Sequence, residues 1–383
     1  MQLTKDEEKA LNGENGQALA TAYRILLAIG KATEAEKLVP VDWAHVSGVN
    51  YNTIGDSGVE FLEQLSSDAK VAVKTTINPM GFDPVKINSL KLSKEFVAKQ
   101  NRIIDAYERM GVTKSFTCIP YEVFDLPDIG TDVSFAESNA AVYANSVAGL
   151  RTNKESAVSA LASSLTGKAP YSELRIEEFR KPNKCIRVND ELDGELDYGL
   201  LGYFAGKVSD NTVAFDGIDY LTKRNAKALS AAIGTSGSCG MFALGKASET
   251  IDFGKEEARK VRDELHTGEK GDVITLGSPQ LGVDDLWMLA SIVQGKKFKK
   301  RCLIFCARAA YESARKLGYT ETVEKAGGEI LCDCCTCLTP LIDRNEVDGV
   351  ITNSIKGAYY LNNWNKVGVC LKSLKDIVKE ECE

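Results

Sequence analysis

The chain has 383 residues, of which 44% are hydrophobic and 26% charged, and its formal net charge is −7. This length allows two or three domains with buried cores, and the composition is typical of a soluble globular protein. No apolar run is long enough for a membrane span, and no lysine or arginine cluster indicates nucleic acid or an anionic membrane as the main partner.

The first residues, MQLTKDEEKALNGENG, are polar and acidic. They do not have the pattern of a secretory signal or a transit peptide, so we expect a cytoplasmic protein. Thr4 and Glu7 have instead the spacing of a helix capping box.

Predicted strands and helices alternate along the first part of the chain. Residues 16–35 have the spacing of an amphipathic helix, VDWAHVSGV and VAVKTTINP predict strands, and DSGVEFLEQLSSDAK predicts a helix between them. SKEFVAKQNRIIDAYERMG predicts a second helix that ends at Gly111. A strand is expected over KSFTCIPY, closed by Pro120 just after Cys118. Residues 137–151 are rich in small and polar side chains, which permit close approach of backbone or ligand.

The second half of the chain changes in character. Residues 175–225 are rich in glycine and aspartate and are expected to be irregular, with a lobe boundary near them. From about residue 271, strands (DVITLGS, RCLIFCA, EILCD, GVITNS, VGVCLKS) alternate with helices. This alternation predicts a parallel sheet whose ligands bind beyond the carboxyl ends of the strands. We predict three α/β regions: an N-terminal lobe 1–180, a middle region 181–270 and a C-terminal lobe 271–383.

Eleven cysteines and two histidines restrict the chemistry. An odd number of cysteines without an export signal argues against a disulfide framework. Four cysteines form two overlapping C-x-x-C pairs in GEILCDCCTCLTP: Cys332 with Cys335, and Cys334 with Cys337. Such pairs suit zinc, an iron–sulfur cluster or a redox dithiol, and buried packing is the alternative for each thiol. Because strand residues alternate between faces, all four cannot converge on one ion if the strand continues.

Six stretches, in order between about residue 42 and residue 360, resemble the large subunit of the aconitase X family. They are AHVSGVNYNTIGDSGVEFLEQL, VKTTINPMGFD, FTCIPYE, AESNAAVYANSVAGLRTN, DYGLLGYFAGK and TNSIKGAYY. The resemblance implies an aconitase-like α/β fold with three α/β domains around a central cleft. The swivelling fourth domain would be absent from this chain and supplied by a separate small subunit.

The resemblance also implies hydro-lyase activity. Archaeal two-subunit members dehydrate mevalonate 5-phosphate to trans-anhydromevalonate 5-phosphate in a mevalonate pathway of isoprenoid biosynthesis, and bacterial members dehydrate cis-3-hydroxyproline. The separate large subunit favours the archaeal activity and a small phosphorylated hydroxy acid as substrate. An iron–sulfur cluster would polarise the substrate hydroxyl and carboxylate, and a serine of the small subunit would act as base. A 4Fe–4S cluster is expected first, with 2Fe–2S and 3Fe–4S as alternatives.

Two cluster ligands follow from the family motifs. Cys118 matches the cysteine of TC-x-PY, and Cys335 matches that of D-T-C. The family's GCPH, however, corresponds to GSPQ here, with Ser278 in place of cysteine and Gln280 in place of histidine.

The third ligand is therefore open. A serine oxygen or another thiol would complete the site, or the cluster would differ or be absent. We predict Cys306, because it ends the next strand in sequence and parallel neighbours place their ends side by side. Cys334 and Cys337 are the alternative candidates for the third ligand.

The same motifs place compact polar groups at predicted strand ends. Glu137 and Lys356 are the predicted catalytic residues, with Glu137 either holding the substrate hydroxyl or acting as an acid. Arg151 is expected to bind a carboxylate or phosphate through two hydrogen bonds, and His45 to be packed or capped. The predicted substrate-binding residues are Ser47, Asn50, Thr76, Asn78, Ser138, Asn139, Asn145, Ser146, Arg151, Ser354 and Lys356.

Three alternatives remain at this point. One is a cis-3-hydroxyproline dehydratase or another 3-hydroxy acid dehydratase, which the number of cations in the cleft should help to separate from a phosphate-binding enzyme. The second is a non-catalytic subunit without a cluster, which the Ser278 and Gln280 departures suggest. The third is a zinc or thiol redox protein, which has only the C-x-x-C pairs in its favour.

Overall fold

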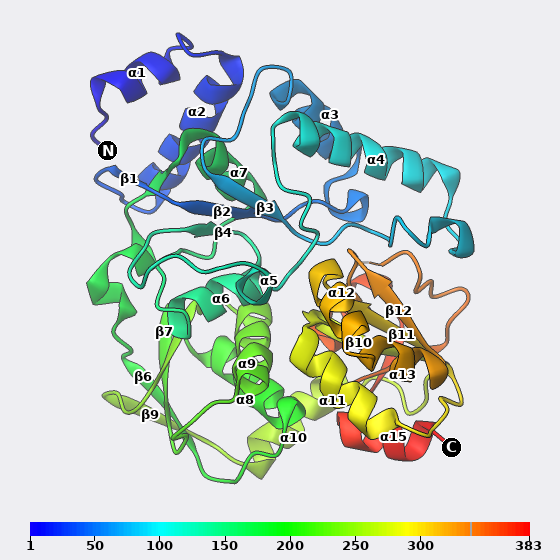
Figure 1. Ribbon diagram of the computed structural model, residues 1–383. Coiled ribbons are helices and arrows are strands. Elements are labelled where there is room, and N and C mark those ends of the chain that lie inside the picture. Colours follow the sequence, from blue (N-terminus) through cyan, green and yellow to red (C-terminus); the bar gives the residue numbers. More distant parts are fainter. Residues whose placement is uncertain (338) are drawn as a thin grey trace.

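The computed structural model describes residues 1–337 and 339–383. Three parallel sheets, each flanked by helices, lie side by side (Figure 1). Their strands fall within residues 43–135, 184–253 and 273–371, so each predicted region contains one sheet. The predicted α/β class is therefore confirmed, and the boundaries near residues 180 and 270 stay a prediction.

The first sheet has three parallel strands in the order β3-β2-β4. Its strands are β2 (Trp43–Val46), β3 (Lys74–Ile77) and β4 (Ser134–Phe135), and β1 (Leu38–Pro40) pairs with β5 (Lys168–Pro170) in a separate antiparallel ribbon. The helices are α1 (Lys5–Leu11), α2 (Gln17–Ala32), α3 (Tyr51–Leu65), α4 (Lys94–Arg109), α5 (Pro120–Val123), α6 (Ser138–Ser146) and α7 (Ala157–Thr166), with short turns η1 (Ile87–Ser89), η2 (Glu173–Arg175) and η3 (Glu177–Arg180). The capping box at Thr4 and Glu7 is confirmed, as is the helix stop at Gly111, which has a φ of 84°.

The predicted strand over KSFTCIPY is wrong. Residues 114–119 are not part of a strand, Phe116 among them has a φ of 39°, and α5 begins at Pro120. The Ser115 hydroxyl takes the place of a ladder partner, because it accepts from Ile77 N at 2.8 Å and donates to Ile77 O at 2.9 Å. Cys118 therefore lies in a loop that runs beside the end of β3.

The middle region has four parallel strands in the order β8-β7-β6-β9. They are β6 (Lys184–Val188), β7 (Thr212–Asp216), β8 (Met241–Leu244) and β9 (Glu249–Phe253), with helices α8 (Glu195–Val208), α9 (Lys223–Ser236) and α10 (Lys255–Leu265). The expectation of irregular structure over residues 175–225 is therefore wrong. The glycines serve close packing of α8 on α9: a Cβ at Gly202 would lie 2.6 Å from Leu229 O, and one at Gly206 would lie 2.7 Å from Ile233 O.

The C-terminal region confirms the predicted parallel sheet, with strand order β12-β11-β10-β13-β14. Its strands are β10 (Val273–Leu281), β11 (Arg301–Cys306), β12 (Gly328–Cys332), β13 (Gly349–Thr352) and β14 (Gly368–Leu371). Its helices are α11 (Val283–Val293), α12 (Arg308–Lys316), α13 (Tyr319–Lys325), α14 (Ile355–Tyr360), η4 (Leu361–Asn365) and α15 (Leu374–Glu381). α12 and α13 are separate helices, because Gly318 adopts a φ of 80° between them.

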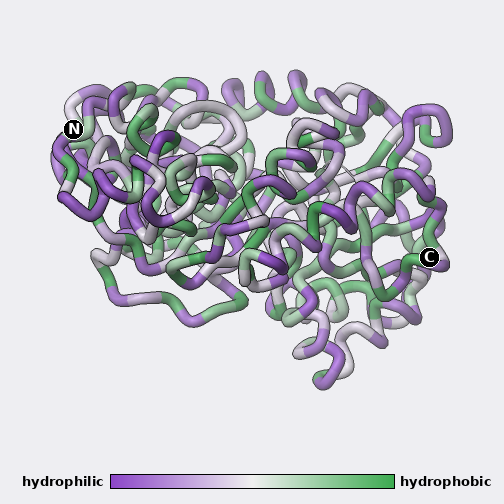
Figure 2. The backbone as a smooth tube through the Cα atoms, turned by 90° about the horizontal axis from the view of Figure 1, so that it is seen from above, coloured by the Kyte–Doolittle hydropathy of each residue, from purple (hydrophilic) through white to green (hydrophobic). Residues whose placement is uncertain are grey.

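Hydrophilic and hydrophobic residues alternate along the outer helices (Figure 2). Within residues 1–337 and 339–383, none of the helices combines the length and the apolar character that a membrane crossing needs.

Candidate active site

A cavity of 380 Å³ lies where the N-terminal and C-terminal regions meet. All three strands of the first sheet end at it, since Ser47 follows β2, Asn78 follows β3, and Glu137 comes two residues after β4. The opposite side is formed by the loop after β12 and by α14, which contributes Lys356. The position agrees with the rule that α/β proteins bind ligands at the carboxyl ends of their strands.

Eight of the predicted site residues line this cavity. They are Ser47, Asn50, Asn78, Cys118, Glu137, Ser138, Cys335 and Lys356. Ser47 and Lys356 are 309 positions apart in the chain (356 − 47), so the tertiary fold brings together side chains that only the motifs connected. Their roles remain predictions.

A directed hydrogen-bond chain leads through the first sheet to Glu137. Trp43 Nε1 donates to Thr76 Oγ1 at 2.8 Å, and Asn78 Nδ2 donates to Glu137 Oε2 at 2.6 Å. The Asn78 oxygen therefore faces His45 Nε2, 2.8 Å away, which must carry the proton. His45 Nδ1 then accepts from the Thr76 hydroxyl at 2.8 Å. Every donor in the chain points toward the Glu137 carboxylate.

Glu137 and Lys356 form an ion pair buried at the wall of the cavity. Burial by itself raises the pKa of Glu137, but Lys356 and Asn78 outweigh it and hold that pKa below its ordinary value. Burial likewise lowers the pKa of Lys356, and the Glu137 carboxylate more than compensates, so the pKa of the lysine is raised. Both groups are therefore charged near neutral pH. An ionised Glu137 accepts hydrogen bonds, which disfavours the predicted alternative of an acid.

His45 should make the folded protein sensitive to acid. Its burial lowers the pKa of the imidazole to about 4, partly offset by Glu137. Below pH 6.5 the unfolded chain binds a proton at His45 and the folded chain does not, so acidification toward pH 4 removes stability. The full pKa difference corresponds to about 3 kcal/mol, of which roughly 2 kcal/mol should be lost between pH 7 and pH 5. Urea unfolding at pH 7 and pH 5 measures it: His45→Gln should lose less stability between these values than the wild type.

The control for this prediction is His266→Gln, which removes the other histidine. His266 lies outside the cavity and accepts a hydrogen bond from Leu371 N at 3.1 Å. If the His45 and His266 variants show the same change of stability with pH, the buried imidazole is not the cause.

Three thiols meet at one end of the cavity: Cys118, Cys335 and Cys337. The Cys335 thiol contacts the thiols of both other residues. The contact with Cys118 lowers the pKa of Cys335, but Cys337 and burial outweigh it and the pKa is raised. Burial also raises the pKa of Cys118, and the neighbouring Cys335 adds to this effect. Without a cation beside them, these two groups stay neutral thiols.

Gln280 and Arg308 hold the backbone of this thiol group in place. Gln280 accepts from Cys118 N at 3.2 Å and donates to Cys334 O at 2.9 Å, so it joins the two cysteine-bearing segments. Arg308 bonds to Asp333 and to Asp83 at 2.6 Å, and thereby ties the loop after β12 to the N-terminal region. Gln280, the residue in place of the family's histidine, thus has a structural role here.

Cys306, the predicted third thiol, is fully buried and does not line the cavity. Alternation along β11 directs Cys306 to the face that packs on α11 and α13, where its sulfur lies 3.7 Å from that of Cys332. Cys334 is also directed into the core and has no exposed surface. Cys337, the remaining rival, lines the cavity.

Several other predicted residues do not line the cavity and hold the structure around it. Thr76 belongs to the hydrogen-bond chain, and Asn139 donates to Cys118 O at 2.7 Å. Asn145 donates to Thr152 O at 2.8 Å, and Ser146 accepts from Phe242 N at 2.8 Å. Asn139, Asn145 and Ser146 of α6 therefore bond to neighbouring backbone, whereas Ser138 at the start of the helix lines the cavity.

Arg151 and Ser354 were also predicted to bind substrate, but neither lines the larger cavity. Arg151 pairs with Glu177 at 3.0 Å, away from the cavity, because the chain after α6 turns outward. Ser354 caps α14 by accepting from Gly357 N at 2.8 Å, and its hydroxyl bonds to Ser278 O.

Two lining residues with side-chain hydroxyls, Tyr360 and Thr53, were not predicted. Tyr360 lies four residues after Lys356 on α14, and this spacing places both on one helix face. Thr53 is three residues after Asn50 at the start of α3. Helical spacing from the predicted residues could have identified both. Burial raises the pKa of Tyr360 to about 12, although Lys356 opposes it, so the phenol remains a proton donor.

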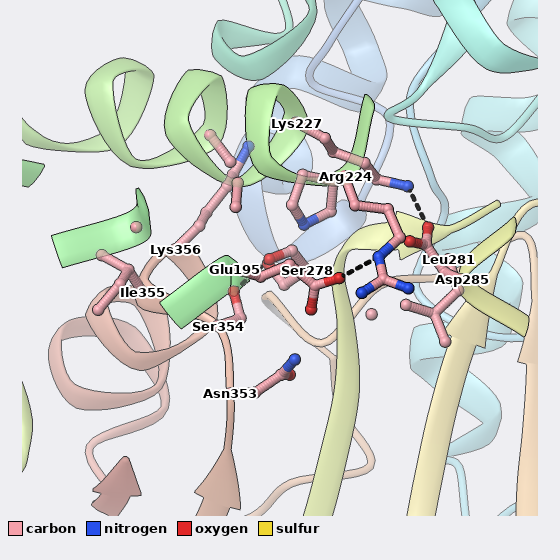
Figure 3. Close-up of a pocket in the computed structure, with 15 residues that line it drawn as sticks. Glu195, Arg224, Lys227, Ser278, Leu281, Asp285, Asn353, Ser354, Ile355 and Lys356 are labelled. Carbon is pink, nitrogen blue, oxygen red and sulfur yellow. Dashed lines mark hydrogen bonds and ion pairs between the residues drawn. The ribbon is translucent and has the colours of Figure 1, made fainter. Parts of the chain in front are cut away.

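Lys356 also lines a smaller cavity of 60 Å³ between the middle and C-terminal regions (Figure 3). There Arg224 pairs with Glu195 at 2.7 Å and Lys227 pairs with Asp285 at 2.6 Å. The Lys227–Asp285 pair joins the middle and C-terminal regions, whereas Arg224 and Glu195 both belong to the middle region.

The donor set at the larger cavity suits a thiolate-bound metal group. Thiolates favour zinc and iron–sulfur clusters, and a bound metal removes the thiol protons. In the described part of the chain, no three histidine, cysteine or carboxylate side chains are grouped so as to hold one metal ion. A cluster is a different case, since each thiolate binds its own iron. The three thiols therefore fit a cluster better than a single zinc ion.

The comparisons with known proteins agree with this architecture. Three α/β regions, of which the first and the last enclose a thiol-lined cavity, are the arrangement of an aconitase-like protein. A crystal structure of Thermococcus kodakaraensis aconitase X in its holo form matches with a TM-score of 0.92, 33% identity and full coverage of both chains. Residues 1–178, 182–278 and 271–383 match the family models for the first, second and third domains of aconitase X. The chain belongs to the aconitase X family.

Several relatives cover nearly the whole chain. The phosphomevalonate dehydratase large subunit of Methanocaldococcus jannaschii is 36% identical over 99% of this chain and 100% of that protein. The protein of the same name from Thermococcus kodakarensis is 34% identical over the same shares. The cis-3-hydroxy-L-proline dehydratase of Hypocrea jecorina is 31% identical over 94% of this chain, and the chain spans 65% of its length.

Proposed function

We propose that the chain is the large, catalytic subunit of a hydro-lyase that dehydrates mevalonate 5-phosphate to trans-anhydromevalonate 5-phosphate. The strongest support is that five archaeal relatives of this name are 32–37% identical to it over 94–99% of the chain. The cis-3-hydroxy-L-proline dehydratases are 31% identical, and the chain spans only 65% of each. Dehydration of cis-3-hydroxyproline is the second candidate.

The cofactor in this proposal is an iron–sulfur cluster, with 4Fe–4S expected first. Cys118 and Cys335 would hold it at the end of the cavity. When bound, such a cluster supplies a Lewis acid that makes the substrate hydroxyl a better leaving group. The three thiols that meet at this end of the cavity support a cluster at this position.

Glu137 and Lys356 would orient the substrate beside the thiols. The ionised Glu137 is fixed by Lys356 and Asn78, so it can accept a hydrogen bond from the substrate hydroxyl and set its direction. Lys356 keeps its positive charge and would attract the substrate carboxylate. Tyr360, protonated at neutral pH, would donate a further hydrogen bond from the same helix face.

The charge of the cavity bears on the choice of substrate. Lys356 is the one cation among the described residues that line it, and Glu137 neutralises it. Binding of a phosphate group would therefore need positively charged or hydrogen-bond-donating groups other than Lys356. The start of α3, where Asn50 caps the helix, opens on the cavity and offers a helix N-terminus, and the partner subunit would offer the rest.

The relatives called large subunits imply a small subunit, and we infer one for this chain. By the family resemblance, it would be a swivelling domain that supplies a serine as the base. A cytoplasmic location stays a prediction.

An anaerobic assay of the chain co-expressed with its small subunit tests the proposal. Mevalonate 5-phosphate and cis-3-hydroxyproline are offered side by side, and the dehydrated product is measured by mass spectrometry. We expect loss of water from mevalonate 5-phosphate only. Dehydration of cis-3-hydroxyproline alone would favour the second candidate. An iron-loaded complex that dehydrates neither would refute the substrate, and a complex that never binds iron would support a non-catalytic subunit.

A further inference from the structure

We propose that Cys337 supplies the third thiolate of the metal site and that Ser278 donates a hydrogen bond to its sulfur. The inference depends on the proposed function for the presence of a cluster, but it concerns which side chains hold it. Cys337 was only a rival in the sequence analysis, and the structure places its thiol beside that of Cys335.

The path of the loop after β12 explains why Cys335 and Cys337 act together. β12 ends at Cys332, and Asp333 adopts a φ of 63°, which turns the chain out of the sheet. Beyond this turn, Cys334 and Thr336 are buried, whereas Cys335 and Cys337 are partly exposed and line the cavity. The alternation resembles that of an extended chain, in which residues two apart point the same way.

Ser278 stands behind Cys337 relative to the cavity. Its hydroxyl lies 3.0 Å from the Cys337 sulfur, yet Ser278 lines only the smaller cavity, and Cys337 lines only the larger one. Ser278 is also 6% exposed. A thiolate accepts hydrogen bonds and cannot donate them, so the Ser278 hydroxyl would donate a hydrogen bond to the sulfur of metal-bound Cys337. Ser278 is therefore a positioning residue rather than a ligand.

The remaining thiols are excluded by their direction. Cys306 faces Cys332 on the far side of the sheet, and both belong to the core between β11, β12 and their helices. Cys334 is buried in the core on the other face of that sheet. Neither Cys306 nor Cys334 lines the cavity, so either would have to leave its core to reach a cluster there.

The test compares Cys337→Ser with Cys306→Ser in the complex with the small subunit. Both are purified anaerobically, supplied with iron and sulfide, and analysed for iron and acid-labile sulfide per chain and for visible absorption. We expect the Cys337 variant to lose the three-thiolate cluster and its absorption, and the Cys306 variant to keep both. Circular dichroism checks that each variant is folded.

A second pair of variants separates loss of a ligand from loss of the fold. Ser278→Cys in the Cys337→Ser background places a thiol next to the vacated sulfur position, and we expect it to recover iron and sulfide. Ser278→Ala should keep the cluster but shift its reduction potential downward, because a hydrogen bond to a ligating sulfur stabilises the more negative reduced state.

The outcomes distinguish this inference from the proposed function. Wild-type iron and sulfide in folded Cys337→Ser, or their loss in Cys306→Ser alone, would overturn the assignment of Cys337 while the cluster itself stands. An unchanged potential in Ser278→Ala would overturn the role of Ser278. A wild-type complex that binds no iron under these conditions would refute the proposed cluster and this inference with it.

Discussion

Replacing either Cys118 or Cys335 by serine is expected to leave the protein without iron. Both sulfurs line the same end of the cavity and contact each other, so each is placed to hold part of one metal group. Serine keeps the volume of the side chain but removes the soft thiolate that iron–sulfur clusters require. Iron and acid-labile sulfide per chain, measured after anaerobic purification of the complex, give the result.

Cys302→Ser is the matched control for these two variants. Cys302 lies on β11, is fully buried, and packs in the core on the same face as Cys306. Its replacement costs some packing but should leave the iron content at the wild-type level. Retained iron in folded Cys335→Ser would contradict the ligand assignment, and loss of iron in Cys302→Ser would indicate that the loss follows from damage to the fold.

Lys356→Met should lower kcat by about a thousandfold, within the range expected for loss of a positioned charged group at an active site. The substitution removes the cation from the cavity wall and leaves Glu137 buried beside Asn78 without its partner. An unpaired buried carboxylate also costs stability, by roughly 3–5 kcal/mol. Steady-state kinetics of the complex and urea unfolding measure the two effects separately.

Lys227→Met controls for the removal of a buried lysine. Lys227 is likewise buried and pairs with Glu122 at 3.0 Å and with Asp285 at 2.6 Å, but it does not line the larger cavity. We expect a loss of stability with little change in kcat. Equal losses of kcat in both variants would mean that Lys356 acts through the fold.

Glu137→Gln in the Lys356→Met background tests the ion pair itself. Because the glutamine carries no charge, the double variant should be more stable than Lys356→Met alone, by about 0.5–3 kcal/mol of coupling. Activity should stay low in both. A double variant no more stable than Lys356→Met would argue against a charged, mutually dependent pair.

The secondary structure could be predicted best where the pattern was regular. The strands and helices after residue 271 alternate with clear periodicity, and the parallel sheet follows from that alternation alone. The middle region could not be predicted, because its glycines have the composition of a loop. In the structure Gly202 and Gly206 lie inside α8, where only contact with α9 explains them.

The predicted site residues fall in one part of the fold, but only some of their side chains line the cavity. Motif residues at the ends of β2, β3 and β4 do line the cavity, because parallel strands place their carboxyl ends together. Arg151 does not, although its charge made it the natural partner of an anion. Its direction is set by the turn after α6 and by Glu177, and neither is visible in a local motif.

By itself the sequence determined the family and the α/β class and indicated two of the thiols, because motifs and strand periodicity are local properties of the chain. Only the tertiary structure decided which third thiol lies beside those of Cys118 and Cys335. From the sequence alone, Cys306 and Cys337 are equally plausible as the third thiol of the site. In the structure, strand β11 directs Cys306 into a core, and a turn at Asp333 directs Cys337 into the cavity. Side-chain direction depends on the path of the backbone after a strand, and packing against the other regions fixes that path.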